Sequence, residues 1–142
     1  MAEACQGAAK YEYHGSFDYP PKFATNAALD FHNQITPAAI EARDRYLAQR
    51  FLTGLRAIDG VDTYTSDDPR LSCALVAFTV KGVPTATLVD TLWNQHTIYI
   101  RNVTHEEIGW DVNRASLHIM VTAKQVDTLL GAVAEIAKTR PS

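Results

Sequence analysis

The sequence predicts an α+β fold, a two-layer sandwich in which an antiparallel or mixed sheet of about four strands carries helices on one face. Helical and strand-like periodicities follow one another in the order α-β-β-α-β-β-α along residues 36–140. The 142 residues are 46% hydrophobic and 20% charged, which is typical of a folded globular chain and excludes a disordered, collagen-like or coiled-coil one.

Two regions of different character are expected. Residues 1–35 lack strong periodicity and are rich in aromatic side chains, namely Tyr11, Tyr13, Phe17, Tyr19, Phe23 and Phe31. Residues 36–142 contain the periodic elements and are predicted to form the compact domain. Its first helix is expected over 36–58, with Thr36 as N-cap, Pro37 in the first helical position and Gly60 just beyond its end.

The middle of the chain predicts two strands and a helix. A short extended piece over 61–65 ends at a turn around Pro69. The continuous apolar run over 72–80 has strand length and predicts a central strand that is buried on both faces. A second helix is expected over 84–95, with Leu88, Leu92 and Trp93 turned inward.

Two further strands and a last helix complete the pattern. Residues 97–103 alternate as a strand, with Tyr99 and Arg101 on one face, and 104–111 form a loop. The strand expected over 112–121 places four apolar residues on one face and four others on the opposite face, namely Arg114, Ser116, His118 and Met120. A capping box between Thr122 and Gln125 opens the last helix.

Charge and motif content exclude several functions. The net charge of −3, without a lysine–arginine run, argues against nucleic acid or an anionic membrane as the main partner. No apolar stretch is long enough to span a bilayer. The start of the chain has no signal-peptide character, and Cys5 and Cys73 are expected to be reduced thiols, so a cytoplasmic location is expected.

No nucleotide-binding, zinc-binding or hydrolase motif is present. His105 with Glu106 and Glu107 suits a solvated acidic loop better than a metal site, and no metal ligand is expected. From the residues alone, Arg114 is the main candidate, because a guanidinium binds a carboxylate through two parallel hydrogen bonds. The alternative is an arginine at a strand edge that is paired with a nearby acid. A general acid–base hydrolase has no supporting constellation of residues.

Three stretches carry a resemblance to a known family. They are residues 12–18 (EYHGSFD) with 27–31 (AALDF), the helix over 40–55, and 112–119 (VNRASLHI) followed by 122–130. In these stretches the chain resembles the C-terminal part of the class V aminotransferases, which are fold-type I pyridoxal phosphate enzymes. The branch that it most resembles contains the isopenicillin N epimerases and the cysteine desulfurase-like lyases.

The resemblance implies roles for four residues. Arg114 matches the family's arginine for the substrate α-carboxylate, and Arg101 is a second substrate-site candidate. Gly15 and Ser16 match positions that help hold the cofactor phosphate. The Schiff-base lysine has no counterpart, since all five lysines (Lys10, Lys22, Lys81, Lys124 and Lys138) lie in other contexts, and no catalytic residue is assigned.

The resemblance spans only about the last third of the family's length, so the family's large domain is expected to be missing. The loop over 104–111 has no cysteine, which disfavours persulfide chemistry and favours an epimerase, lyase or transaminase as the parent activity. The first hypothesis is a small-domain portion, inactive alone, that works with a large-domain chain on an amino acid. The alternative is a stand-alone, non-catalytic module that forms homo-oligomers or binds a small carboxylate.

Overall fold

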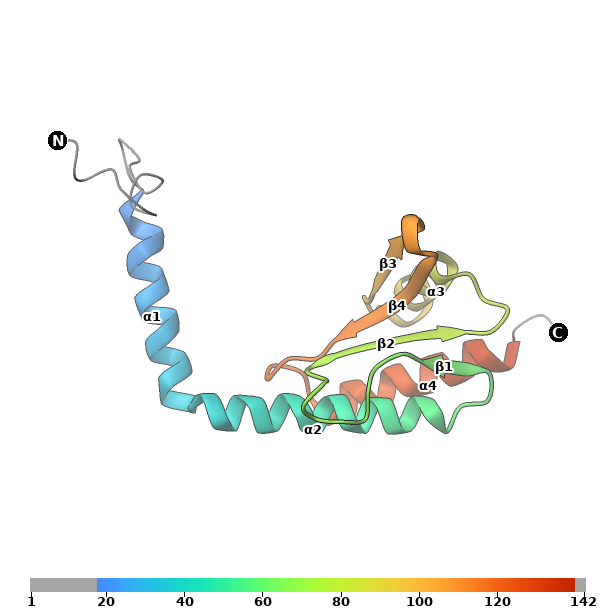
Figure 1. Ribbon diagram of the computed structural model, residues 1–142, viewed down its shortest axis with the longest axis horizontal. Coiled ribbons are helices and arrows are strands. Elements are labelled where there is room, and N and C mark those ends of the chain that lie inside the picture. The colour runs from blue at the N-terminus through green and yellow to red at the C-terminus, as the bar shows by residue number, and fades with distance from the viewer. Residues whose placement is uncertain (1–17, 140–142) are drawn as a thin grey trace. The chain divides into compact units, whose positions relative to one another are not determined.

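The computed structural model describes residues 18–139 of the chain (Figure 1). The chain divides into two compact units between Pro37 and Ala38, and each is considered by itself. In the N-terminal region, for which the sequence predicts no element from periodicity, Tyr19–Ile35 form helix α1. Prolines in its first turn and the alanines that follow favour a helix. None of its residues is buried.

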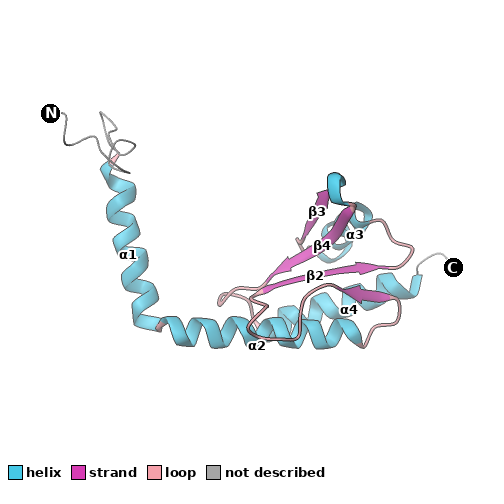
Figure 2. Cartoon of the chain, viewed as in Figure 1, coloured by secondary structure: helices cyan, strands magenta, loops and turns pink. Residues whose placement is uncertain are grey.

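The second unit contains the predicted elements. They are α2 (Pro37–Arg56), β1 (Val61–Thr63), β2 (Leu75–Val80), α3 (Thr85–His96), β3 (Arg101–His105), a short 3-10 turn (Glu106–Ile108), β4 (Trp110–Ser116) and α4 (Ala123–Thr139). The strands form one antiparallel sheet in the order β1-β2-β4-β3. Figure 2 shows α2 and α4 along the same side of this sheet. The predicted α+β fold is therefore confirmed.

The core lies between the sheet and helices α2, α3 and α4. Phe51 of α2 and Phe78 of β2 are fully buried and meet edge to face, with their ring centroids 5.7 Å apart. Leu88 and Leu92 bring α3 into the same core, and α4 adds an apolar stripe that includes Val133. Helices α2 and α4 are also joined at the surface, where Arg50 and Asp127 form a two-pronged ion pair at 2.7 and 2.8 Å.

The ends of the first predicted strands differ from expectation. Strand β2 starts only at Leu75, which is exposed, and its alternate residues are half-buried, so it is buried on one face instead of two. The residues before it are held in a loop, because Asp68 accepts hydrogen bonds from Arg70 and Ser72, and Arg45 binds the Ser72 carbonyl. Cys73 lies in this region as a free, exposed thiol instead of a buried small residue.

The segment before β3 is not a strand. Thr97 has a left-handed conformation (φ 56°), and the Ile98 amide donates to the carbonyl of Leu92, so 97–100 stay attached to the end of α3. The alternation is nevertheless confirmed, since Ile100 is buried and Tyr99 is 71% exposed. Trp93 contacts Tyr99 at the surface and is 54% exposed, so its predicted inward position is wrong.

The predicted loop over 104–111 is mostly a tight hairpin, in which Gly109 supplies a left-handed turn (φ 65°) between β3 and β4. Strand β4 then ends at Ser116, five residues earlier than predicted. A turn closed by the Val121 amide and the His118 carbonyl follows. The capping box is confirmed, with the Thr122 amide donating to Gln125 Oε1 at 2.8 Å and the Gln125 amide donating to Thr122 Oγ1 at 3.2 Å.

None of the helices within residues 18–139 has the length and apolar character needed to cross a lipid bilayer.

Candidate functional site

Alternate residues of β4 project to opposite faces of the sheet. Asn113 and Ala115 are buried against the helices, so Arg114 and Ser116 lie on the other side. We call this second side the distal face. The strand register extends it across the neighbouring strands, so that it comprises Leu75, Ala77 and Thr79 of β2, Val112, Arg114 and Ser116 of β4, and Arg101 and Val103 of β3.

Two arginines meet on the distal face. Arg101 of β3 is paired directly with Arg114 of β4, and Ala77 occupies the third position of the same row. Directly opposed residues of antiparallel strands have neighbouring side chains, and two like charges in these positions destabilise the sheet. An anion placed between the two guanidinium groups would remove this repulsion. The pairing therefore favours an anion-binding row.

The hydrogen bonding of the arginines supports this assignment. Residues 18–139 contain seven arginines, of which five bind a carboxylate or a carbonyl: Arg43, Arg45, Arg50, Arg56 and Arg70. Within that range Arg101 and Arg114 have no such partner, and Arg114 Nε is buried without an acceptor. A buried unpaired donor is costly, so Arg114 is suited to a ligand carboxylate. The alternative, that Arg114 is paired with an acid, is not what the described residues show.

A polar network on the helix-covered side fixes the register of this row. The Asn113 side chain is buried and donates to the Thr85 carbonyl at 2.8 Å, while the Thr85 hydroxyl donates to Asp111. Asn102 and Thr104 donate to the same carboxylate at 2.8 and 3.0 Å. These bonds join the first turn of α3 to both strands that carry the arginines.

Hydrogen bonds from Thr85, and then from Asn102 and Thr104, hold the pKa of Asp111 below its ordinary value. Sequence analysis missed this network. The one available signal was Asn113, a polar residue at an inward position of the strand.

The other residues predicted for the site do not all lie together. Ser116 lies on the distal face beside Arg114, at the exposed end of β4. His118 does not share that face, because the strand has ended, and its Nδ1 accepts a hydrogen bond from the Met120 amide. Gly15 and Ser16 lie outside the described residues, so the structure does not test them.

The lysines of the second unit, residues 38–139, do not lie beside the arginine pair. Lys81 forms an ion pair with Asp62 at 3.6 Å. Lys124 and Lys138 are on α4, on the other side of the sheet from Arg114. Lys22 is on α1. Residues 18–139 contain no group of three or more histidine, cysteine, aspartate or glutamate residues that could hold a metal ion.

These features define a small α+β domain whose distal face carries the opposed residues Arg101 and Arg114. The model of the aminotransferase class-V family matches residues 3–129. The chain therefore belongs to the aminotransferase class-V family.

Two curated relatives are isopenicillin N epimerases. The one from Streptomyces clavuligerus is 30% identical over 128 residues, and the one from Amycolatopsis lactamdurans is 29% identical over 128 residues. The match covers 89% of this chain but 32% of either relative, so the chain spans about a third of their length.

Solved structures show the same fold. An apo cysteine desulfurase from Thermococcus onnurineus NA1 superposes with a TM-score of 0.71 at 25% identity, over 79% of this chain and 29% of that one. A cysteine desulfurase from Escherichia coli gives 0.69 at 26% identity, over 81% and 29%. The family resemblance stated from the sequence is thus confirmed.

Proposed function

We propose that this chain is the small-domain portion of a pyridoxal phosphate-dependent class V aminotransferase-like enzyme that acts on an amino acid. The observation that carries this proposal is Arg114, whose buried Nε has no acceptor among the described residues and which directly opposes Arg101. In this role Arg114 binds the substrate α-carboxylate and Arg101 assists it. Pyridoxal phosphate, when bound in such an enzyme, supplies an electron sink for chemistry at the α-carbon.

The chain is proposed to be inactive alone. It spans about a third of the length of its epimerase relatives, and the lysines of the second unit are on α4 or paired with Asp62. A large-domain chain, or the rest of a longer protein, would then complete the site. Exposed aromatic residues support such a partner, because Tyr64 and Trp110 meet edge to face and are 49% and 36% exposed.

The proposed reaction class is epimerase, lyase or transaminase. The β3–β4 hairpin lacks a cysteine, which supports leaving persulfide chemistry out. A cytoplasmic location stays a prediction. The alternative proposal is a stand-alone module that uses the distal face to form homo-oligomers or to bind a small carboxylate.

Carboxylate binding is the direct test. L-Alanine is titrated into the ¹⁵N-labelled chain while the Nε–H signals of the arginines are followed, with L-alaninamide as the control that lacks the carboxylate. We expect L-alanine alone to move the Arg114 and Arg101 signals, and Arg114→Gln to abolish the shift of the Arg101 signal. The matched control is Arg70→Gln, since Arg70 is paired with Asp68 in a loop. Equal responses to both ligands, or an unchanged response of Arg114→Gln, would contradict the proposal.

Sedimentation equilibrium separates the two proposals. A monomer that forms a stable complex only with a lysine-bearing large domain supports the enzyme portion. A homo-oligomer whose affinity is lost on changing Trp110 to serine supports the stand-alone module.

A further inference from the structure

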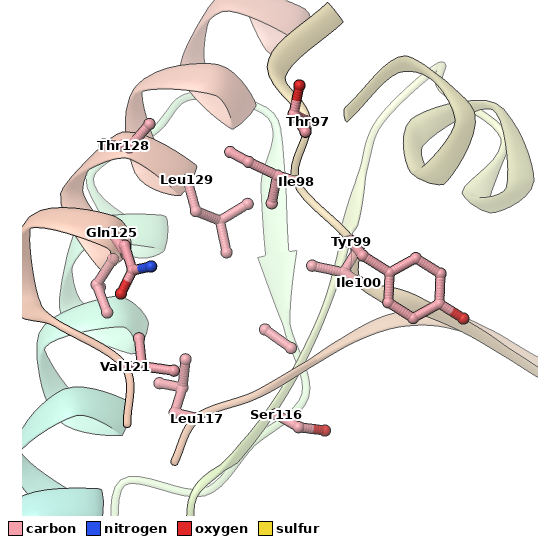
Figure 3. A pocket seen from close by; sticks show the side chains of 12 residues that line it. Thr97, Ile98, Tyr99, Ile100, Ser116, Leu117, Val121, Gln125, Thr128 and Leu129 are labelled. Atoms are coloured by element: carbon pink, nitrogen blue, oxygen red, sulfur yellow. The ribbon is translucent and has the colours of Figure 1, made fainter. Parts of the chain in front are cut away.

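A pocket lies on the helix-covered side of the sheet, at the place where the segment before β3 separates from the end of β4. Its volume is about 340 Å³, and it is bounded by residues 97–100, the end of β4 and the first turns of α4. Figure 3 shows Ile98, Ile100 and Leu129 pointing into it, whereas the Tyr99 and Ser116 side chains point away. Tyr99 and Ser116 therefore line the pocket with their main chains.

The strand register shows which main-chain groups face this space. The Leu117 amide donates to the carbonyl of Ala74, so Leu117 directs its amide and carbonyl toward β2. Main-chain groups alternate in direction along an antiparallel strand, and those of Ser116 consequently point away from β2. The pairing of Arg101 with Arg114 would continue two residues further as Tyr99 with Ser116.

That pair is not formed. Strand β3 starts at Arg101, and in the described chain no main-chain hydrogen bond joins Tyr99 to Ser116. The cause is local, because the Ile98 amide is bound to the Leu92 carbonyl and draws the segment toward α3. The main-chain amide and carbonyl of Ser116 are therefore left without a partner strand at this edge of the sheet.

The residues that line the pocket further limit which kind of ligand it can bind. None of its residues carries a charge, and its apolar contacts are branched aliphatic side chains. An ionised group would lose its hydration there without a partner. Gln125 adds one polar group: its Oε1 is used by the capping box, and its amide nitrogen points into the pocket in Figure 3.

We propose that this opening binds a small, neutral, peptide-like ligand that consists of an extended amide unit with a branched aliphatic side chain. The amide pairs with the Ser116 main chain in the position that Tyr99 leaves unoccupied, as an added strand residue does. The aliphatic group lies between Ile98, Leu117 and Leu129, and Gln125 Nε2 donates to a second ligand carbonyl. A pocket of this volume is at the small end of the usual range for ligands, which suits one or two residues.

The probe is N-acetyl-L-leucine methylamide, with N-acetyl-L-leucine as the charged comparison. Both are titrated into the full chain and followed through backbone amide signals. We expect the neutral probe to shift Ser116, Tyr99 and the Gln125 side-chain amide with saturation, and the charged compound to bind at least about tenfold more weakly. Absence of saturable shifts at these positions, or equal affinity for both compounds, would overturn the proposal.

Two variants and one control give a second test. Gln125→Glu keeps the oxygen that the capping box needs and loses the donor, so affinity should fall about tenfold while stability is unchanged. Thr128→Phe places a ring at a residue that lines the pocket and should abolish binding, whereas Lys124→Phe on the same helix should not. Wild-type affinity in both pocket variants overturns the proposal. So does a strong Tyr99–Ser116 cross-strand contact with slow amide exchange in the free protein, because the opening would then be closed.

Discussion

Gly54 on α2 and Gly131 on α4 are helical glycines whose surroundings differ sharply. A Cβ added at Gly54 would lie 2.4 and 2.7 Å from the two methyl carbons of Leu130 and 3.1 Å from its Cγ. A Cβ added at Gly131 would meet nothing within 4 Å. Gly54 therefore leaves room for the Leu130 side chain of α4, and Gly131 has no such role.

The same substitution should have opposite effects at the two sites. Replacing glycine by alanine inside a helix stabilises a protein by about 1 kcal/mol, and Gly131→Ala should show this gain. At Gly54 the new methyl group overlaps carbons whose ordinary contact distance is about 3.5–4.0 Å. Relieving such an overlap costs about 1–3 kcal/mol, so Gly54→Ala should be less stable than Gly131→Ala by about that amount.

Urea denaturation monitored by circular dichroism measures the difference, provided that the slope of the transition is the same in both proteins. The double variant Gly54→Ala/Leu130→Ala removes the overlapping atoms. In the Leu130→Ala background, Gly54→Ala should become stabilising by up to about 1 kcal/mol. If Gly54→Ala alone stabilises the protein as much as Gly131→Ala does, the packing described for α2 and α4 is wrong.

Three further changes test the core, the polar network and the surface. Phe78→Ala should cost about 3–5 kcal/mol in chemical denaturation, because a fully buried ring and its contact with Phe51 are lost, and a cost under about 1 kcal/mol would refute the core assignment. The pKa of Asp111 is lowered in the folded state, so its stabilisation is present above the pKa of the unfolded chain and is lost as the pH falls through the folded value. Asp111→Asn should therefore be less stable than the wild type at neutral pH, with a difference that narrows below about pH 4, and a constant difference in denaturation curves across that range would contradict this. The Arg50–Asp127 pair is about half exposed, so a double-mutant cycle should show a small coupling that weakens in 1 M salt, and a coupling independent of salt would contradict its surface character.

Much of the fold could be predicted from periodicity, and the predictions that were wrong have local structural causes. The helices that pack through Leu88 and Val133 and the four-stranded count were predicted, because burial on one side leaves a period in the sequence. The ends of the strands were not predicted, because hydrogen bonds outside the sheet determine where each strand begins. Arg45 fixes the loop before β2, and the Ile98–Leu92 bond detaches 97–100 from the sheet.

The site was predicted in part for the same reason. Alternation placed Arg114 and Ser116 on one face, and the structure agrees up to the last residue of β4. It could not show that Arg101 directly opposes Arg114, because the register between two strands depends on the hairpin that joins them. Helix α1 was not predicted from periodicity, and the structure shows that none of its residues is buried.

Strand β4 carries the core and the arginine site in alternate positions, and this limits how the chain can change in length. One residue inserted or deleted within the strand would exchange the two sets, turning Asn113 toward the distal face and Arg114 toward the apolar core. Inserting or deleting two residues instead of one would restore the alternation. Length variation among related chains should therefore be concentrated in the turn at Glu106–Ile108 and after Ser116, and it should be excluded from the seven residues of β4.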